Sequence, residues 1–133
     1  VEINNLVGDE NMKIFGYKSD EVENFYRHGG YNSGEVCGND PRLRRMTEQL
    51  VDGFFSKCNY NFWGIYDALL RYNDEYFVLG DFDSYVKAWE NMDRIYSDRE
   101  RWSRMSLANI ANSAFFSSDR TIREYAEDIW KAL

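Results

Sequence analysis

Two carboxylates spaced one residue apart, Asp81 and Asp83, are the first side chains of this sequence whose spacing suggests chemistry. A pair of carboxyl groups that flanks a glycosidic bond can hydrolyse it, and the separation of the two groups sets the stereochemical outcome. Both residues also stand at a predicted helix start, where a carboxylate accepts hydrogen bonds from the first-turn amides. A calcium loop is excluded because Tyr85 occupies the third ligand position and the required glycine is missing. We therefore interpret the pair as helix-capping residues.

The residue types that bind metals or act as nucleophiles are few. The sequence contains one histidine, His28, and two cysteines, Cys37 and Cys58. A zinc site needs several imidazole or thiolate ligands at short spacing, and a Cys–His nucleophile needs a cysteine that approaches His28, which no pattern predicts. We expect no metal site, a solvated His28, and cysteines that stay reduced in a cytoplasmic protein.

Four glycines, Gly29, Gly30, Gly34 and Gly38, lie close together and raise the question of a phosphate-binding loop. A P-loop follows a strand and ends in Gly-Lys-Ser/Thr, and a dinucleotide loop needs G-x-G-x-x-G between a strand and a helix. Neither pattern is present, and a helix precedes these glycines. We predict a flexible loop over residues 30–40.

Aromatic residues make up 17% of the chain, and the four tryptophans could in principle stack on sugar rings. At helical spacing such residues belong more often to a core, and we predict a core role for Trp63, Trp89, Trp102 and Trp130. So many large apolar side chains on so few elements also imply faces that need more protein to cover them.

Periodicity predicts a mainly α-helical chain with two short strands. A chain of 133 residues is expected to form one domain, and 44% hydrophobic residues argue against disorder. The apolar spacing predicts helices over residues 19–28, 40–53, 62–72, 81–96, 97 to about 110, and 118–130, and strands over 12–17 and 76–79.

Three helix starts carry explicit capping signals. Asp40 precedes the only proline, Pro41, at the first helical position. The segment 97–100, Ser-Asp-Arg-Glu, matches a capping box. At the last helix, Ser118 or Asp119 is expected to cap, and Thr121 with Glu124 repeats the capping-box spacing.

Charge and hydropathy exclude several classes of partner. The net charge of −7 disfavours nucleic acid, because phosphate neutralisation needs a clustered excess of Lys and Arg. No apolar run approaches the ~18 residues that span a bilayer, and residues 1–5 lack the features of a signal peptide. We expect no nucleic-acid partner, no membrane contact and a cytoplasmic location.

The stretch 116–130, Phe-Ser-Ser-Asp-Arg-Thr-Ile-Arg-Glu-Tyr-Ala-Glu-Asp-Ile-Trp, resembles the C-terminal end of the glycogen, starch and maltodextrin phosphorylases, the α-glucan phosphorylase family. Val1-Glu2-Ile3 resembles the end of the family stretch Asp-Gly-Ala-Asn-Val-Glu-Ile. Further family-like strings occur in order at residues 41–49, 52–56, 74–79, 81–86, 101–105 and 109–111. The chain departs from the family pattern at Ala114-Phe115, which replaces the usual Gly-Lys, and around residues 34–38.

The resemblance implies an enzyme that transfers the terminal glucosyl unit of an α-1,4-glucan to inorganic phosphate and releases glucose 1-phosphate. It implies a parent α/β fold of two Rossmann-like lobes of the GT-B type, in an allosteric enzyme family. It also implies pyridoxal phosphate, held by a lysine of the C-terminal lobe.

Asn11-Met12-Lys13 matches the end of the family's cofactor motif, Glu-Ala-Ser-Gly-Thr-Gly-Asn-Met-Lys. The residues before it differ, because Asp9 and Glu10 place carboxylates where the motif has glycines and anion-binding amides. We therefore interpret Lys13 as an exposed surface lysine and expect the cofactor lysine upstream of Val1. We assign no catalytic, cofactor-binding or metal-binding residue to this chain.

Residues 1–133 are accordingly expected to form a single segment, the C-terminal part of the parent's C-terminal lobe. Its predicted role is structural, and the isolated chain is expected to bind no cofactor, to be inactive and to self-associate through uncovered apolar faces. The expected partner is the remainder of the phosphorylase chain, which the face formed by Ile122, Tyr125, Ile129 and Trp130 would brace. A stand-alone helical interaction module derived from the enzyme is the alternative.

Overall fold

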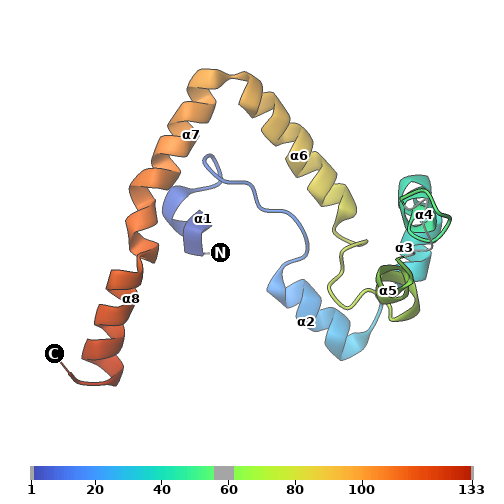
Figure 1. Cartoon of the computed structure of the whole chain (residues 1–133), viewed down its shortest axis with the longest axis horizontal. Coiled ribbons are helices and arrows are strands. Elements are labelled where there is room, and N and C mark those ends of the chain that lie inside the picture. Colours follow the sequence, from blue (N-terminus) through green and yellow to red (C-terminus); the bar gives the residue numbers. More distant parts are fainter. Residues whose placement is uncertain (1, 56–61, 133) are drawn as a thin grey trace. The chain divides into compact units, whose positions relative to one another are not determined.

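The computed structural model describes residues 2–55 and 62–132, and this part of the chain is mainly helical, as predicted (Figure 1). The helices are α1 (Glu2–Val7), α2 (Ser19–His28), α3 (Ser33–Asn39), α4 (Pro41–Gln49), α5 (Trp63–Tyr66), α6 (Phe82–Ser97), α7 (Arg99–Asn112) and α8 (Ser118–Glu124). The π-helical turns η1 (Asp67–Arg71) and η3 (Tyr125–Ile129) extend α5 and α8, and the 3-10 turn η2 (Ser113–Phe116) follows α7.

Contacts divide the chain into two compact units. The middle unit comprises Phe15–Lys87, and the terminal unit comprises Val1–Ile14 together with Ala88–Leu133. Within the described ranges, no helix is long and apolar enough to cross a membrane.

Capping explains where the predicted helices begin. The Asp40 carboxylate accepts a hydrogen bond from the amide of Arg42 at 2.8 Å, and Pro41 occupies the first position of α4, which confirms that prediction. At α7 the cap is Asp98, whose carboxylate accepts from the amide of Arg101 at 3.0 Å, one residue later than the predicted capping box.

The capping prediction for the last helix was wrong by one residue. Ser117 caps α8 by accepting from the amide of Arg120, so Ser118 and Asp119 already lie inside the helix. Thr121 donates its hydroxyl back to the Ser117 carbonyl at 3.2 Å, and Glu124 pairs with Arg120. The second capping box therefore does not form.

Both predicted strands were wrong, since residues 2–55 and 62–132 contain no β-strand. The segment 12–17 is irregular, because the amides of Gly16 and Tyr17 donate to side chains at the start of α6 and not to a neighbouring strand. The segment 76–79 is a turn in which Phe77 has a φ of 58° and the amide of Leu79 donates to the buried Asp74 carboxylate. Side-chain acceptors therefore outcompete a sheet ladder at both places.

The predicted loop over residues 30–40 contains α3, so that prediction was also wrong. The Asn32 side chain caps the helix by accepting from the amide of Glu35 at 3.1 Å. Ser33 and Cys37, one turn apart, are both buried. A cap and a buried face outweigh the poor helix propensity of the two glycines inside this short helix.

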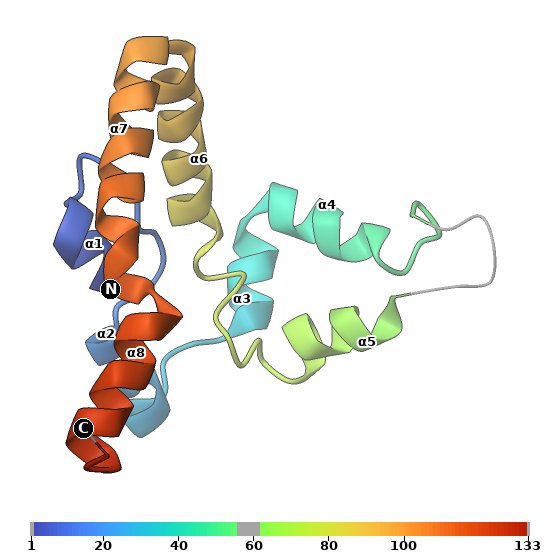
Figure 2. The same ribbon diagram turned by 60° about the vertical axis from the view of Figure 1, so that its left-hand side comes forward.

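The core of the middle unit forms where α3, α4 and the turn before α6 meet. Cys37, Leu43 and Leu79 are buried together, and Val36, Leu69, Leu70 and Phe82 pack against them. Helix α3 contacts both α4 and η1, and Figure 2 shows α3 leading into α4 and the chain returning through α5.

The terminal unit is built around α7, on which α1 packs. Its buried apolar side chains include Val7, Ile95 and Met105. The amide group of Asn109 joins the two parts of the unit by donating to the carbonyl of Asn11 at 2.9 Å. In both views α8 continues from α7 in nearly the same direction (Figures 1 and 2).

The predicted core role of the tryptophans was wrong for three of the four. Trp63, Trp89 and Trp130 are exposed, and only Trp102 is half-buried, edge-on to the ring of Tyr96. The other expectation from the same residues, uncovered apolar faces, is confirmed. Most of the apolar side chains of α8 and η3 are exposed, including Ile122, Tyr125, Ile129 and Trp130.

Candidate functional site

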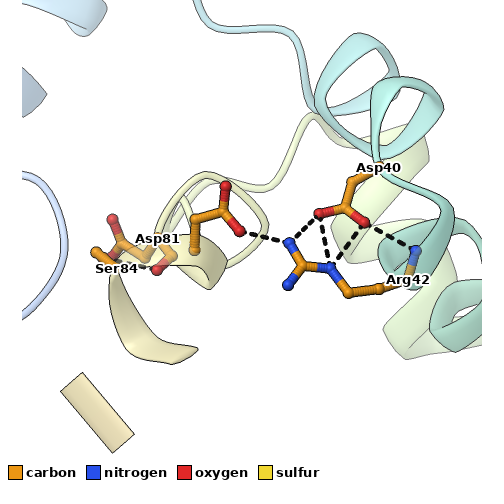
Figure 3. A network of polar contacts seen from close by, with 5 residues as sticks. Asp40, Arg42, Asp81 and Ser84 are labelled. Carbon is orange, nitrogen blue, oxygen red and sulfur yellow. Dashed lines mark hydrogen bonds and ion pairs between the residues drawn. The ribbon is translucent and has the colours of Figure 1, made fainter. Parts of the chain in front are cut away.

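The carboxylates of Asp81 and Asp83 lie at the start of α6 but bond to different segments. Asp81 accepts a hydrogen bond from the amide of Tyr17 at 2.9 Å, and the neighbouring Ser84 hydroxyl accepts from the amide of Gly16 at 2.9 Å. The Ser84 hydroxyl also donates to the carbonyl of Asp81 at 2.7 Å (Figure 3). The capping interpretation was therefore wrong for both side chains, which hold other parts of the middle unit and not the first turn of α6.

Gly16 permits this contact. Its φ is +90°, and a Cβ atom at this position would lie 2.5 Å from a carboxylate oxygen of Asp81. Any larger residue would be strained here and would push the carboxylate away. The hydrogen bonds that hold residues 16–17 against the start of α6 therefore depend on glycine.

Arg42 bridges two carboxylates from separate elements. Its guanidinium donates to Asp40 at 2.6 Å (Figure 3) and to Asp83 at 2.5 Å. It also lies over the ring of Phe82, at 4.9 Å from the ring centre. The hydrogen bonds from Arg42 lower the pKa of Asp40 to about 2. The bridge therefore stays ionised at neutral pH and links the start of α4 to the start of α6.

A cavity of about 520 Å³ lies beside this bridge. It is lined by Val36, Asn39, Asp40, Pro41, Arg42, Leu43, Leu79, Gly80, Phe82 and Asp83. Its cation, Arg42, is already paired with two carboxylates, so it offers little to an anionic ligand such as phosphate. Ion pairs this exposed contribute little to stability, and we interpret the bridge as a positioning contact.

A second polar network surrounds the buried carboxylate of Asp74, in the turn that precedes α6. Tyr31 donates its hydroxyl to the Asp74 carboxylate at 2.7 Å, and the same carboxylate accepts from the amide of Leu79 at 2.7 Å. The amide of Gly80 donates to the Tyr31 hydroxyl at 3.1 Å. Burial, followed by the hydrogen bond and charge of Asp74, raises the pKa of Tyr31 above its usual range.

Asn73 extends this network to α3. Its side chain accepts from the amide of Ser33 at 2.8 Å and donates to the carbonyl of Tyr31 at 3.1 Å. The buried Asp74 therefore sits in a polar network that ties residues 73–80 to residues 31–33. Sequence reasoning missed both residues, although Asn73 and Asp74 are the types that tolerate the positive φ found there.

Aromatic rings gather around Phe77 in the same part of the middle unit. The rings of Tyr17, Phe25, Tyr26 and Tyr31 have their centres within 5.9 Å of the Phe77 ring centre. A cavity of about 290 Å³ opens beside them, lined by Phe25, Tyr26, Gly29, Tyr31, Tyr72, Asn73, Asp74, Glu75 and Phe77. This cavity combines aromatic walls with polar groups.

The remaining candidates lie apart from these clusters. Lys13 is half-buried rather than fully exposed, and its Nζ donates to the carbonyl of Asp9. His28 is exposed at the end of α2, as expected. Cys37 is a free buried thiol with its Sγ 3.4 Å from the Thr47 hydroxyl, while Cys58 falls outside the described residues.

Residues 2–55 and 62–132 hold no group of three or more His, Cys, Asp or Glu side chains that could bind a metal ion. The glycines at 29 and 30 have positive φ in the turn after α2, and Gly34 and Gly38 lie in α3. These four glycines do not form one loop around a ligand.

Comparison with known proteins identifies relatives over nearly the whole chain. Residues 1–132 match the profile of the family described as carbohydrate phosphorylase. The chain is 49% identical over 130 residues to a glycogen phosphorylase of Bacillus subtilis (strain 168), and 42% identical over 131 residues to one of Pasteurella multocida (strain Pm70). It is 38% identical over 130 residues to the muscle form of glycogen phosphorylase of Mus musculus.

In each of these three comparisons the match covers 98% of the chain. It covers only 16% of the two bacterial relatives and 15% of the mouse relative. The chain therefore spans about one-sixth of the length of the curated relatives it matches.

Proposed function

We propose that this chain, which belongs to the carbohydrate phosphorylase family, has a structural role inside a longer enzyme. The proposed parent is a cytoplasmic α-glucan phosphorylase that transfers a terminal glucosyl unit to phosphate and gives glucose 1-phosphate. Its fold would be two Rossmann-like lobes with pyridoxal phosphate as cofactor. Residues 1–133 would form the C-terminal segment of its C-terminal lobe.

The observation that carries this role is the uncovered apolar surface of the terminal unit. Leu107 and Ile110 on α7, Ile122 on α8, and Ile129 and Trp130 after it are all exposed. Soluble monomers rarely expose so many large apolar side chains on consecutive elements, because burying each one would stabilise the fold by about 1.5–3 kcal/mol. We propose that the remainder of the phosphorylase chain covers them, and that the isolated chain self-associates through them.

The surroundings of Lys13 do not fit a pyridoxal phosphate site. Its Nζ donates to the Asp9 carbonyl, and the exposed carboxylates of Asp9 and Glu10 precede it in the sequence. A phosphate group needs amide or cationic donors at such a place. We therefore propose no catalytic or cofactor role for Lys13, and we expect the isolated chain to be inactive.

Fragment complementation tests the proposal. The chain is mixed with the Bacillus subtilis relative truncated by the residues that match it, and glucose 1-phosphate formation from maltodextrin and phosphate is measured. We expect neither part to be active alone and the mixture to recover activity. The double variant Ile122→Asp/Ile129→Asp should reduce recovered activity roughly tenfold or more, because two charges would have to be buried at the contact.

Arg123→Asp is the matched control, since it also adds a carboxylate to an exposed position of α8. It should leave recovery nearly unchanged. Turnover by the chain alone would overturn the structural role. So would a folded mixture that recovers nothing, which would favour a stand-alone helical interaction module.

A further inference from the structure

The aromatic cavity of the middle unit has the composition of a sugar-ring site. Ligand pockets are lined mainly by aromatic and apolar groups with a few polar groups that fix orientation. This cavity of about 290 Å³ has five aromatic rings among its lining residues, together with Asn73, Asp74 and Glu75. We propose that it binds one glucosyl ring of an α-1,4-glucan, a proposal that rests on the proposed function for its choice of ligand.

Two tyrosines at the cavity present open rings to a ligand. Tyr26 and Tyr72 line it, yet their side chains are 65% and 67% exposed. Tyr26 is held in place, because its hydroxyl donates to the carbonyl of Glu75 at 2.9 Å and its ring packs edge-on to Phe77 at 5.6 Å. A ring fixed before binding loses little entropy when the apolar face of a pyranose packs on it.

Some polar groups of the cavity already have hydrogen-bond partners in the protein, whereas others can still bond to a ligand. Asp74 is 3% exposed and already accepts from Tyr31 and Leu79, so it shapes the wall. The carboxylate of Glu75 is exposed and has no hydrogen-bond or ion-pair partner among the described residues, and the same holds for the Tyr72 hydroxyl. These two groups can accept from and donate to sugar hydroxyls.

Charge selects a neutral ligand over an anionic one. Asp74 and Glu75 both line the cavity, and no Lys or Arg does. Phosphate and nucleotides would meet uncompensated negative charge, whereas a polyhydroxyl ring would not. An organic cation is the other ligand that aromatic walls and a carboxylate could attract, and the experiment separates the two.

The volume is at the lower end of small-molecule pockets, which fits one ring and not a whole oligosaccharide. A contact of this size gives affinity in the millimolar range. A long glucan would gain from repeated rebinding along its length. The site would therefore retain polymer and not discriminate finely among short oligosaccharides.

The test uses the 133-residue chain itself. Binding of maltoheptaose is followed by NMR titration, and retention of the chain is followed by native electrophoresis in gels that contain glycogen. Tyr72→Ala should weaken both roughly tenfold. Tyr76→Ala is the matched control, because Tyr76 is 80% exposed, lies four residues away and does not line the cavity, so it should bind as the wild type does.

The variant Glu75→Gln and a titration with tetramethylammonium distinguish a sugar-binding site from a cation-binding site. A sugar site keeps most of its affinity with Gln, which still accepts hydrogen bonds, whereas a cation site loses it. Absence of saturable maltoheptaose binding to the folded chain, equal loss in the Tyr72 and Tyr76 variants, or binding of tetramethylammonium alone would overturn the proposal. Because complementation reads activity and this experiment reads binding, a chain that complements but does not bind glucan contradicts only the glucan site.

Discussion

The middle unit and the terminal unit differ in where their side chains find partners. In the middle unit, side chains bond across long stretches of sequence: Asp81 reaches Tyr17, 64 residues away, and Asp74 reaches Tyr31, 43 residues away. In the terminal unit most side-chain hydrogen bonds are local, such as that from Ser103 to the carbonyl of Arg99, four residues earlier. Asn109, which reaches Asn11, is the long-range exception.

The two units also use their apolar residues differently. The middle unit surrounds Phe77 with rings and buries Leu43 and Leu79 in a shared core. The terminal unit leaves Leu107, Ile110 and Ile129 exposed along α7 and beyond α8. The middle unit also exposes large apolar side chains, such as Phe54, Trp63 and Ile65, so the two units differ in their buried clusters and not in whether apolar faces are uncovered.

The largest expected difference between the units comes from removing one leucine side chain in each. Leu43 is 2% exposed in the middle unit, so Leu43→Ala should lower the free energy of unfolding by about 3 kcal/mol, because it leaves a cavity. Leu107 is 66% exposed, so Leu107→Ala should change the free energy of unfolding by no more than about 0.5 kcal/mol. Urea unfolding followed by circular dichroism measures both.

Light scattering at micromolar concentrations tests whether the exposed face of the terminal unit makes the chain self-associate. Leu107→Ala should reduce self-association of the chain, since it removes apolar surface that has no partner within the described terminal unit. Equal destabilisation by the two variants, or a wild-type chain that is monomeric throughout, would show that the terminal unit has no uncovered face in solution.

A smaller effect is expected from the buried carboxylate of the middle unit. Asp74→Ala leaves the Tyr31 hydroxyl and the Leu79 amide without their acceptor, and it should cost about 2 kcal/mol of unfolding free energy. Asp74→Asn keeps one acceptor oxygen and tolerates the φ of 49°, so part of the stability should return. Thermal or urea unfolding of both variants checks this.

Glu75→Ala is the control, because that side chain is exposed and adjacent. If it destabilises the chain as much as Asp74→Ala, the effect belongs to the turn and not to the buried network.

The smallest predicted effect concerns pH. The pKa of Tyr31 is raised by burial and by Asp74, so the folded chain holds this proton where the unfolded chain loses it. The contribution is fully present below about pH 10, the ordinary tyrosine pKa, and unfolding free energy should fall as pH rises above it. Tyr31→Phe should cost about 1 kcal/mol at neutral pH and show a shallower alkaline decline.

Urea unfolding between pH 7 and the alkaline range measures that decline, with Tyr76→Phe as the control. Tyr17, whose pKa is also raised by burial, will leave some alkaline dependence in the variant. Identical alkaline slopes for wild type and Tyr31→Phe would contradict the role of the Tyr31–Asp74 bond.

Helix starts with local signals were predictable from the sequence, and elements fixed by distant partners were not. Asp40 and Pro41 act within one turn of their own positions, so their pattern predicted the start of α4. The run 76–79 has strong β propensity, but its backbone follows the buried carboxylate of Asp74 and the rings around Phe77. Periodicity contains no information on such contacts.

The candidate site shows the same division. The spacing of Asp81 and Asp83 correctly placed both at the beginning of α6, yet their partners Tyr17 and Arg42 lie 64 and 41 residues away. Nothing in the sequence indicated that Tyr26 and Tyr72 would line the same cavity. The Asn32 cap of α3, in contrast, could have been found, because Asn followed three residues later by Glu is a recognised helix start.

At position 77, the backbone conformation and the surrounding aromatic rings favour different residue types. The φ of 58° is cheap only for glycine, asparagine or aspartate, whereas the surrounding rings require a large aromatic side chain. No natural amino acid satisfies both requirements, so every replacement exchanges one kind of misfit for another. The tolerance of the turn to substitution is therefore set by four partner rings elsewhere in the chain, and a change in Tyr17, Phe25, Tyr26 or Tyr31 alters which residue position 77 can accept.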